Sequence, residues 1–119
     1  MKKDSPLLNK SFDLGVLVVK LCQKINHDKK EFVLSKQLLR SGTSPGAMIR
    51  EAQKAESKAD FIHKLKIAEK ESAETQYWLE LMLKTDIITI EDFKSTNDLC
   101  VEVSKMLSSA ITTLKKTRN

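Results

Sequence analysis

The sequence is poor both in residues that interrupt helices and in residues that build sheets. Its 119 residues include only three glycines and two prolines, so we expect long elements joined by short loops. Aromatic residues make up 5% of the chain, and runs of β-branched residues are few, which argues against a sheet. Lysine, glutamate, leucine, alanine and serine dominate, as is typical of helical proteins. These scarcities predict an all-α protein.

The sequence also lacks long apolar runs. None approaches the roughly 18 residues that a transmembrane helix needs, so no membrane association is expected. A secretion signal would need an apolar segment near the N-terminus, but Asp4, Asn9, Lys10 and Asp13 occupy that stretch. We therefore expect a cytoplasmic protein whose residues 1–119 form a single domain.

Residues that carry catalytic or metal chemistry are scarce too. The two cysteines, Cys22 and Cys100, lie on apolar stripes and are interpreted as reduced core residues. Neither has a histidine in an evident motif, and there is no glycine-rich phosphate loop. Only Asp60 and His63 have the Glu-x-x-His-like spacing of a di-iron bundle, which needs two such motifs. We expect no enzyme activity, no cofactor and no metal, and interpret His63 as a surface or boundary residue.

Positive charge exceeds negative charge mainly at the start of the chain. The formal net charge is +5, and residues 1–30 hold seven lysines against three aspartates. Residues 58–85 and 86–119 are each balanced. This mild bias permits a nucleic-acid partner without requiring one.

Helix-start signals and apolar periodicity predict four helices in an antiparallel up-down-up-down bundle. The polar stretch NHDKKE (26–31) is expected to be the first loop, and the second helix is expected over 35–55. The predicted N-caps are Ser5 before Pro6, Ser35, Ser57 with Asp60 three residues on, and Thr89 with Asp92.

Apolar stripes with helical spacing support these four segments. The cleanest stripe, in the third helix, is Phe61, Leu65, Ala68, Ser72, Thr75, Leu79 and Met82. The fourth helix is expected to bury Phe93, Asn97, Cys100, Val103, Leu107, Ala110 and Leu114. The first helix has two stripes: Leu8, Phe12, Gly15, Val19 and Cys22, and beside them Leu14, Leu17, Leu21 and Ile25. Two apolar faces are more than the outer helix of a lone monomer needs.

Small residues gather in the middle of the second helix, in the stretch LLRSGTSPGAMIREA (38–52). The apolar period continues through it, so we predict one helix rather than two. We expect the small side chains of Ser41, Ser44, Ala47 and the glycines to pack closely against Ala68, Ser72 and Thr75 of the third helix. Pro45 cannot donate to the carbonyl of residue 41, so a kink is expected near 41–45. Alternatively, Pro45 is a tolerated surface residue.

The same stretch resembles the bacterial four-helix-bundle protein family, which includes proteins encoded in intervening sequences of ribosomal RNA genes and accessory variability proteins of retroelements. The likeness covers essentially the whole chain and is strongest over 37–82. Two positions depart from the family pattern: Pro45 stands for a usual Ile, and Met48 for a usual Asn. The matching residues are Arg40, Ser41, Gly42, Thr43, Ser44, Gly46, Ala47, Ile49, Glu51 and Ala52.

The resemblance carries implications about partners. It implies a homo-oligomer, with a pentameric ring as the arrangement. Retroelement members of the family are thought to bind nucleic acid and a reverse transcriptase, so RNA, DNA or such a protein is a candidate partner. Most members have no assigned activity.

Charged and aromatic residues of the second and third helices are candidates for structural or interface roles. We expect Arg40 to pair with Glu71 or Glu74, within the bundle or across a subunit boundary, because buried charges need partners. Glu51 flanks the same small-residue run. Solvated charges on an outer face are the alternative. Tyr77 and Trp78 are candidate interface anchors, with ordinary boundary packing as the alternative.

In an up-down-up-down bundle, the start of the first and third helices and the end of the second and fourth share one end. We call this end the basic pole, and its cations are Lys2, Lys3, Lys10, Arg50, Lys54, Lys58, Lys115, Lys116 and Arg118. The sequence therefore favours a non-enzymatic homo-oligomer that binds structured RNA or other nucleic acid through backbone phosphates. A protein-interaction scaffold without a nucleic-acid role is the alternative.

Overall fold

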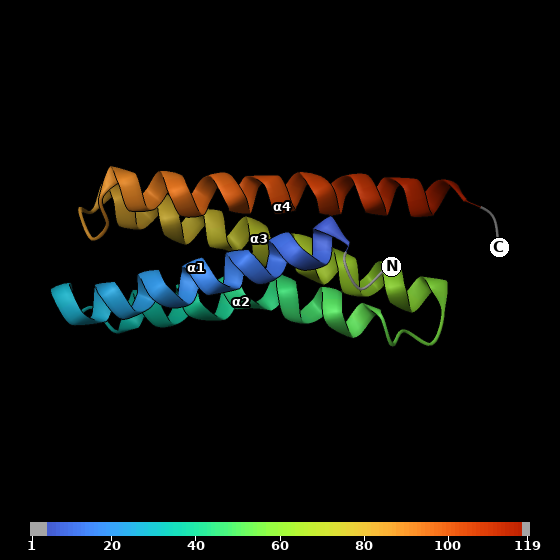
Figure 1. The fold of residues 1–119 in the computed structure, drawn as a ribbon, viewed down its shortest axis with the longest axis horizontal. Helices are drawn as coiled ribbons and strands as arrows, with labels where there is room; N and C mark the ends of the chain where they lie inside the picture. Colours follow the sequence, from blue (N-terminus) through green and yellow to red (C-terminus); the bar gives the residue numbers. More distant parts are fainter. Residues whose placement is uncertain (1–4, 118–119) are drawn as a thin grey trace.

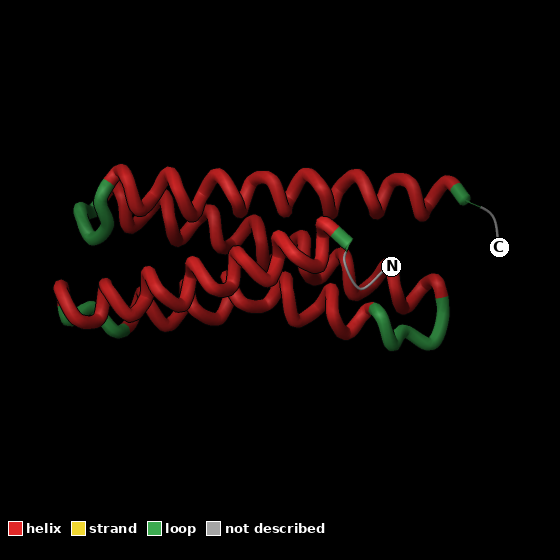
Figure 2. The backbone as a smooth tube through the Cα atoms, viewed as in Figure 1, coloured by secondary structure: helices red, strands yellow, loops and turns green. Residues whose placement is uncertain are grey.

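Four antiparallel helices form an elongated bundle in the computed structural model, which describes residues 5–117 (Figure 1). The bundle measures 51 × 23 × 20 Å, and its loops lie only at the two ends (Figure 2). Within the described residues, contacts follow a square in which α1 and α2, α2 and α3, α3 and α4, and α1 and α4 are neighbours. The helices are α1 (Pro6–Lys29), α2 (Val33–Ala52), α3 (Lys58–Lys84) and α4 (Ile90–Lys116). The all-α bundle prediction is confirmed.

Three of the four predicted N-caps are present. The Ser57 hydroxyl accepts a hydrogen bond from the Asp60 amide at 3.0 Å, and the Thr89 hydroxyl accepts one from the Asp92 amide at 3.1 Å. Ser5 caps α1 in the same way, immediately before Pro6. Each cap satisfies a backbone N–H that has no partner inside its helix.

The junction between α1 and α2 differs from the prediction. α1 continues to Lys29 through the expected loop, and Lys30 then turns the chain in a left-handed conformation with φ of 54°. Ser35 is not an N-cap, because α2 begins at Val33 and the Glu31 carboxylate accepts from the Leu34 amide at 2.7 Å. α2 also ends at residue 52 rather than 55. An acidic side chain capping from outside the helix leaves no periodic signal in the sequence.

The core is built from one stripe of each helix. In α3 the expected stripe is buried from Leu65 to Met82. In α4 the buried stripe is Thr96, Cys100, Val103, Leu107 and Ile111, so the expected positions Phe93, Asn97, Ala110 and Leu114 are only half-buried. The prediction for α4 was therefore wrong at the two ends of the stripe. The expected and the observed sets both have helical spacing, and the positions of α1 and α3 decide which set is buried.

α1 buries most of one apolar stripe and little of the other. Leu14, Leu21 and Ile25 of the second stripe face the core, together with Val18, while Leu17 is half-buried. Of the first stripe Cys22 is buried, but Phe12 is 56% exposed and Val19 is 37% exposed. The outer face of α1 is therefore apolar.

The glycines of α2 allow it to approach α1 rather than α3. A Cβ added to Gly42 would lie 2.6 Å from a methyl carbon of Val18, and one added to Gly46 would lie 3.1 Å from the Ser11 carbonyl oxygen. The predicted close packing of these glycines against α3 is therefore wrong. Ser41 does face α3, where its hydroxyl accepts a hydrogen bond from Thr75 Oγ1 at 3.0 Å.

Pro45 lies inside α2 and is buried, so the surface interpretation of this residue is wrong. The helix is unbroken around it, as the apolar period predicts. Its ring removes the N–H that would bond to the Ser41 carbonyl. The kink expected at 41–45 stays a prediction.

Within residues 5–117, no helix combines the length and the apolar character that crossing a membrane requires.

Gly42→Ala will test the α1–α2 contact. The added methyl group has no room beside Val18, so the free energy of unfolding should fall by about 1–3 kcal/mol despite the better helix propensity of alanine. Gly15→Ala is the matched control, because a Cβ there meets nothing within 4 Å and should stabilise by about 0.5–1 kcal/mol. Urea unfolding measures both. Equal effects at the two glycines would contradict the packing described.

Candidate functional site

The cations predicted for the basic pole are not equivalent in the structure. Lys2, Lys3 and Arg118 lie outside the described residues. Lys10 pairs with Glu102 of α4 at 2.9 Å. The Lys58 ammonium donates to the Thr117 hydroxyl at 2.7 Å, so these two lysines are engaged within the fold.

Other cations of the basic pole remain at the surface. Lys54 and Lys116 are exposed and form no ion pair with any described carboxylate. Arg50 lies with its guanidinium 5.6 Å from the centre of the Phe12 ring, a cation–π arrangement. This contact places Arg50 on the outer face of α1 and α2 rather than at the tip of the bundle.

Lys66 joins the basic pole although the sequence did not point to it. The pKa of Lys115 is lowered, first by its side-chain hydrogen bond with Lys66 and then by the positive charge of that lysine, while Glu69 partly offsets this effect. The pairing links α3 to α4 across 49 positions of sequence, so no local motif could reveal it. Two neighbouring like charges favour an anion near them.

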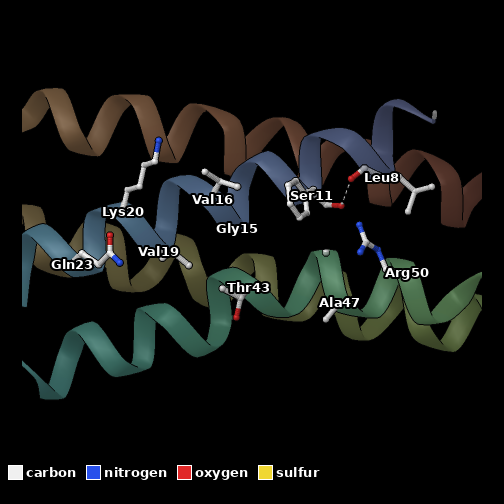
Figure 3. Close-up of a pocket in the computed structure, with 12 residues that line it drawn as sticks. Leu8, Ser11, Gly15, Val16, Val19, Lys20, Gln23, Thr43, Ala47 and Arg50 are labelled. Carbon is white, nitrogen blue, oxygen red and sulfur yellow. Dashed lines mark hydrogen bonds between the residues drawn. The ribbon is translucent and has the colours of Figure 1, made fainter. Parts of the chain in front are cut away.

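A groove follows the outer face of α1 and α2 (Figure 3). Its volume is about 620 Å³. Phe12, Val16 and Val19 supply apolar walls, and Thr43, Gly46 and Ala47 of α2 form the other side. We call it the α1–α2 groove. The sequence indicated only that one apolar stripe of α1 was in excess; the contribution of α2 depends on the tertiary contact.

The expected pairing of Arg40 is present within the subunit. Its guanidinium lies 3.1 Å from a Glu71 carboxylate oxygen and also contacts Glu74. Trp78 Nε1 donates to the same Glu74 oxygen at 2.9 Å. Because the Glu71 side chain is only 15% exposed, the arginine compensates a largely desolvated carboxylate and joins α2 to α3.

The remaining candidate residues have structural surroundings. Glu51 pairs with Lys64 at 3.3 Å, a second bond between α2 and α3. Ser44 is half-buried. Tyr77 is 56% exposed, and its ring packs edge-on against Trp78 with centroids 5.0 Å apart. Of this aromatic pair, Tyr77 is exposed and Trp78 is half-buried.

The thiols are buried. The Cys22 thiol donates to the Ser35 carbonyl oxygen at 3.2 Å, and burial raises its pKa to about 11. Burial also raises the pKa of Cys100, which the hydrogen bond with Ser72 partly offsets. Both groups therefore remain protonated at neutral pH, which makes them poor nucleophiles.

His63 is exposed, and Asp60 accepts a hydrogen bond from the Glu56 amide at 3.2 Å. Among the residues that the structure describes, no three His, Cys, Asp or Glu side chains are grouped closely enough to hold a metal ion.

These features define a small helical bundle with an apolar groove on one face and, at one end, exposed cations that make no ion pair within residues 5–117. The sequence model of the 23S rRNA-intervening sequence protein family matches residues 3–109. The chain therefore belongs to the 23S rRNA-intervening sequence protein family. No curated protein matches significantly.

A solved structure agrees with the assignment. It is the 1.70 Å crystal structure of a protein with unknown function from the S23 ribosomal protein family of Bacteroides thetaiotaomicron. That protein is 50% identical to this chain, with a TM-score of 0.87, over 93% of this chain and 99% of its own. The fold and the family are thus shown independently.

Arg40→Ala should lower the free energy of unfolding by about 1 kcal/mol, because Glu71 and Glu74 lose their partner while Glu71 stays largely desolvated. Lys36→Ala removes an exposed cation of the same helix that makes no ion pair with a described residue, and should change stability by less than about 0.5 kcal/mol. Urea unfolding compares them. Indistinguishable variants would show that the pairing contributes nothing to stability.

Native protein should react slowly with Ellman's reagent at pH 8, because both thiols are buried and their pKa values are raised. In denaturant, two thiols per chain should react at once. Absorbance at 412 nm follows the reaction. Rapid reaction of the native protein would contradict the burial of Cys22 and Cys100.

Proposed function

We propose that this protein is a non-enzymatic homo-oligomer that binds structured RNA, or another nucleic acid, through backbone phosphates at the basic pole. The observation that carries the proposal is the group of exposed lysines near this end, Lys54, Lys66, Lys115 and Lys116, in which Lys66 lies near enough to lower the pKa of Lys115. A phosphate between the two ammonium groups would relieve their repulsion. Exposed Lys54 and Lys116 near the same end add to the attraction.

The net charge of the chain and the names of its family and of the similar structure agree with this proposal. The net charge of +5 favours polyanions in general, and an oligomer would multiply the basic pole by its subunit number. The names of the family and of the similar structure both refer to ribosomal components, which agrees with an RNA ligand. Because no base-reading motif is present in the sequence, the binding would depend on charge and shape.

A protein-interaction scaffold in the cytoplasm is the second candidate function. The observation that favours it is the α1–α2 groove, whose apolar walls suit a protein surface better than a phosphate backbone. A reverse transcriptase or another protein is the partner class that the family resemblance suggests. Binding that is insensitive to salt would favour this second function.

Fluorescence anisotropy with a labelled RNA hairpin and a matched DNA duplex tests the first proposal. Affinity for the hairpin should fall by about 10-fold or more between about 50 and 200 mM salt, because several counterions are released on binding. The variant Lys66→Gln/Lys115→Gln/Lys116→Gln should bind about 10-fold more weakly at the lower salt and show a smaller salt slope.

The control is Lys29→Gln/Lys30→Gln/Lys84→Gln, which removes the same charge from the opposite end of the bundle and should bind like the original protein. Equal losses of affinity in the two triple variants would show that binding depends on net charge rather than on the basic pole. No saturable binding to the hairpin or the duplex at the lower salt would refute the nucleic-acid proposal.

A further inference from the structure

The α1–α2 groove leaves apolar surface in water. Phe12 is 56% exposed, and Val16 and Val19 are each 37% exposed, side by side along one helix. The close-up shows Val19 of α1 on the side that borders α2, with Thr43 and Ala47 of α2 across from it (Figure 3). A contiguous apolar surface of this kind on a small protein is a candidate interaction site.

The charges of the groove restrict its occupant. Its lining contains two cations, Arg50 and Lys20, and no acidic residue. Arg50 lies over the Phe12 ring, so its guanidinium stands beside the most exposed apolar side chain. The complementary surface should therefore present an aromatic or aliphatic side chain with a carboxylate next to it.

Such a surface exists on α3 of the same chain. Tyr77 is 56% exposed, and one turn later Glu80 is exposed and makes no ion pair with any described residue. Leu81 is half-buried beside them, in a shallow hollow that also includes Leu83 and Lys84. Outside the groove, the other exposed aromatic is Phe32. Its neighbour Glu31 is half-buried and accepts from the Leu34 amide at 2.7 Å, whereas Lys30 and Lys36 are exposed and would bring like charges to Arg50.

We propose that the Tyr77–Leu81 face of α3 in one copy docks into the α1–α2 groove of a second copy, with Glu80 beside Arg50. This inference rests on the homo-oligomer of the proposed function and names its contact. The groove volume of about 620 Å³ accommodates an aromatic and an aliphatic side chain together.

The two surfaces lie on different faces of the bundle, because α3 does not contact α1 within the described residues. The contact is therefore heterologous, and every subunit uses its groove for one neighbour and its α3 face for another. Repetition of such a contact produces a closed ring, or a filament where the rotation does not close.

A charge exchange tests the contact. Arg50→Glu and Glu80→Arg should each raise the dissociation constant of the oligomer by about 10-fold or more, because each places like charges together. The double variant Arg50→Glu/Glu80→Arg should return it to within about threefold of the original value. Sedimentation velocity over a concentration series measures assembly, and circular dichroism with urea unfolding confirms that each variant is folded.

Lys36→Glu is the matched control, since it reverses one exposed charge on α2 outside the groove and should leave assembly unchanged. An oligomer that tolerates both single variants, or a double variant that is not restored, would overturn the docking contact and leave the homo-oligomer standing. A protein that stays monomeric throughout the concentration series would overturn both. Binding of the groove to a foreign acidic helix by such a monomer would assign the groove to another partner.

Discussion

The close approach of α1 and α2 at Gly42 and Gly46 is the contact on which the rest of the structure depends. The close contacts of Val18 and the Ser11 backbone with these glycines set the rotation of α1 about its axis. That rotation turns Leu14 and Val18 into the core. It also turns Phe12, Val16 and Val19 outward, so the packing that stabilises the monomer creates the α1–α2 groove at the same time.

Buried hydroxyl groups align the other helices. Thr75 donates to Ser41 across the α2–α3 contact at 3.0 Å, and the Ser72 hydroxyl lies 2.5 Å from that of Ser104 across the α3–α4 contact. A buried hydroxyl that loses its partner costs more than a contact between methyl groups, so these bonds penalise a longitudinal shift of one helix along another. They place the ends of α3 and α4 side by side, which is the condition for Lys66 to meet Lys115.

The surface charges divide into two groups with different physical roles. Arg40, Lys64 and Lys10 pair across helix boundaries and support the bundle. Lys66 and Lys115 instead place like charges near one another, an arrangement that a bound anion would stabilise. This division separates the residues whose loss should affect folding from those whose loss should affect binding. The sequence alone does not distinguish the two groups.

The sequence by itself determined the helical class, the number of helices, three of the four N-caps and the buried stripe of α3, because these depend on spacing and on local hydrogen bonds. Only the tertiary structure decided which apolar residues of α1 are buried, that Gly42 faces Val18 rather than α3, and that Lys66 lies near Lys115. Periodicity shows that a helix has an apolar face. Where a helix has two apolar stripes, as α1 does, the neighbouring helices decide which residues are buried, and no local pattern specifies the positions of those helices.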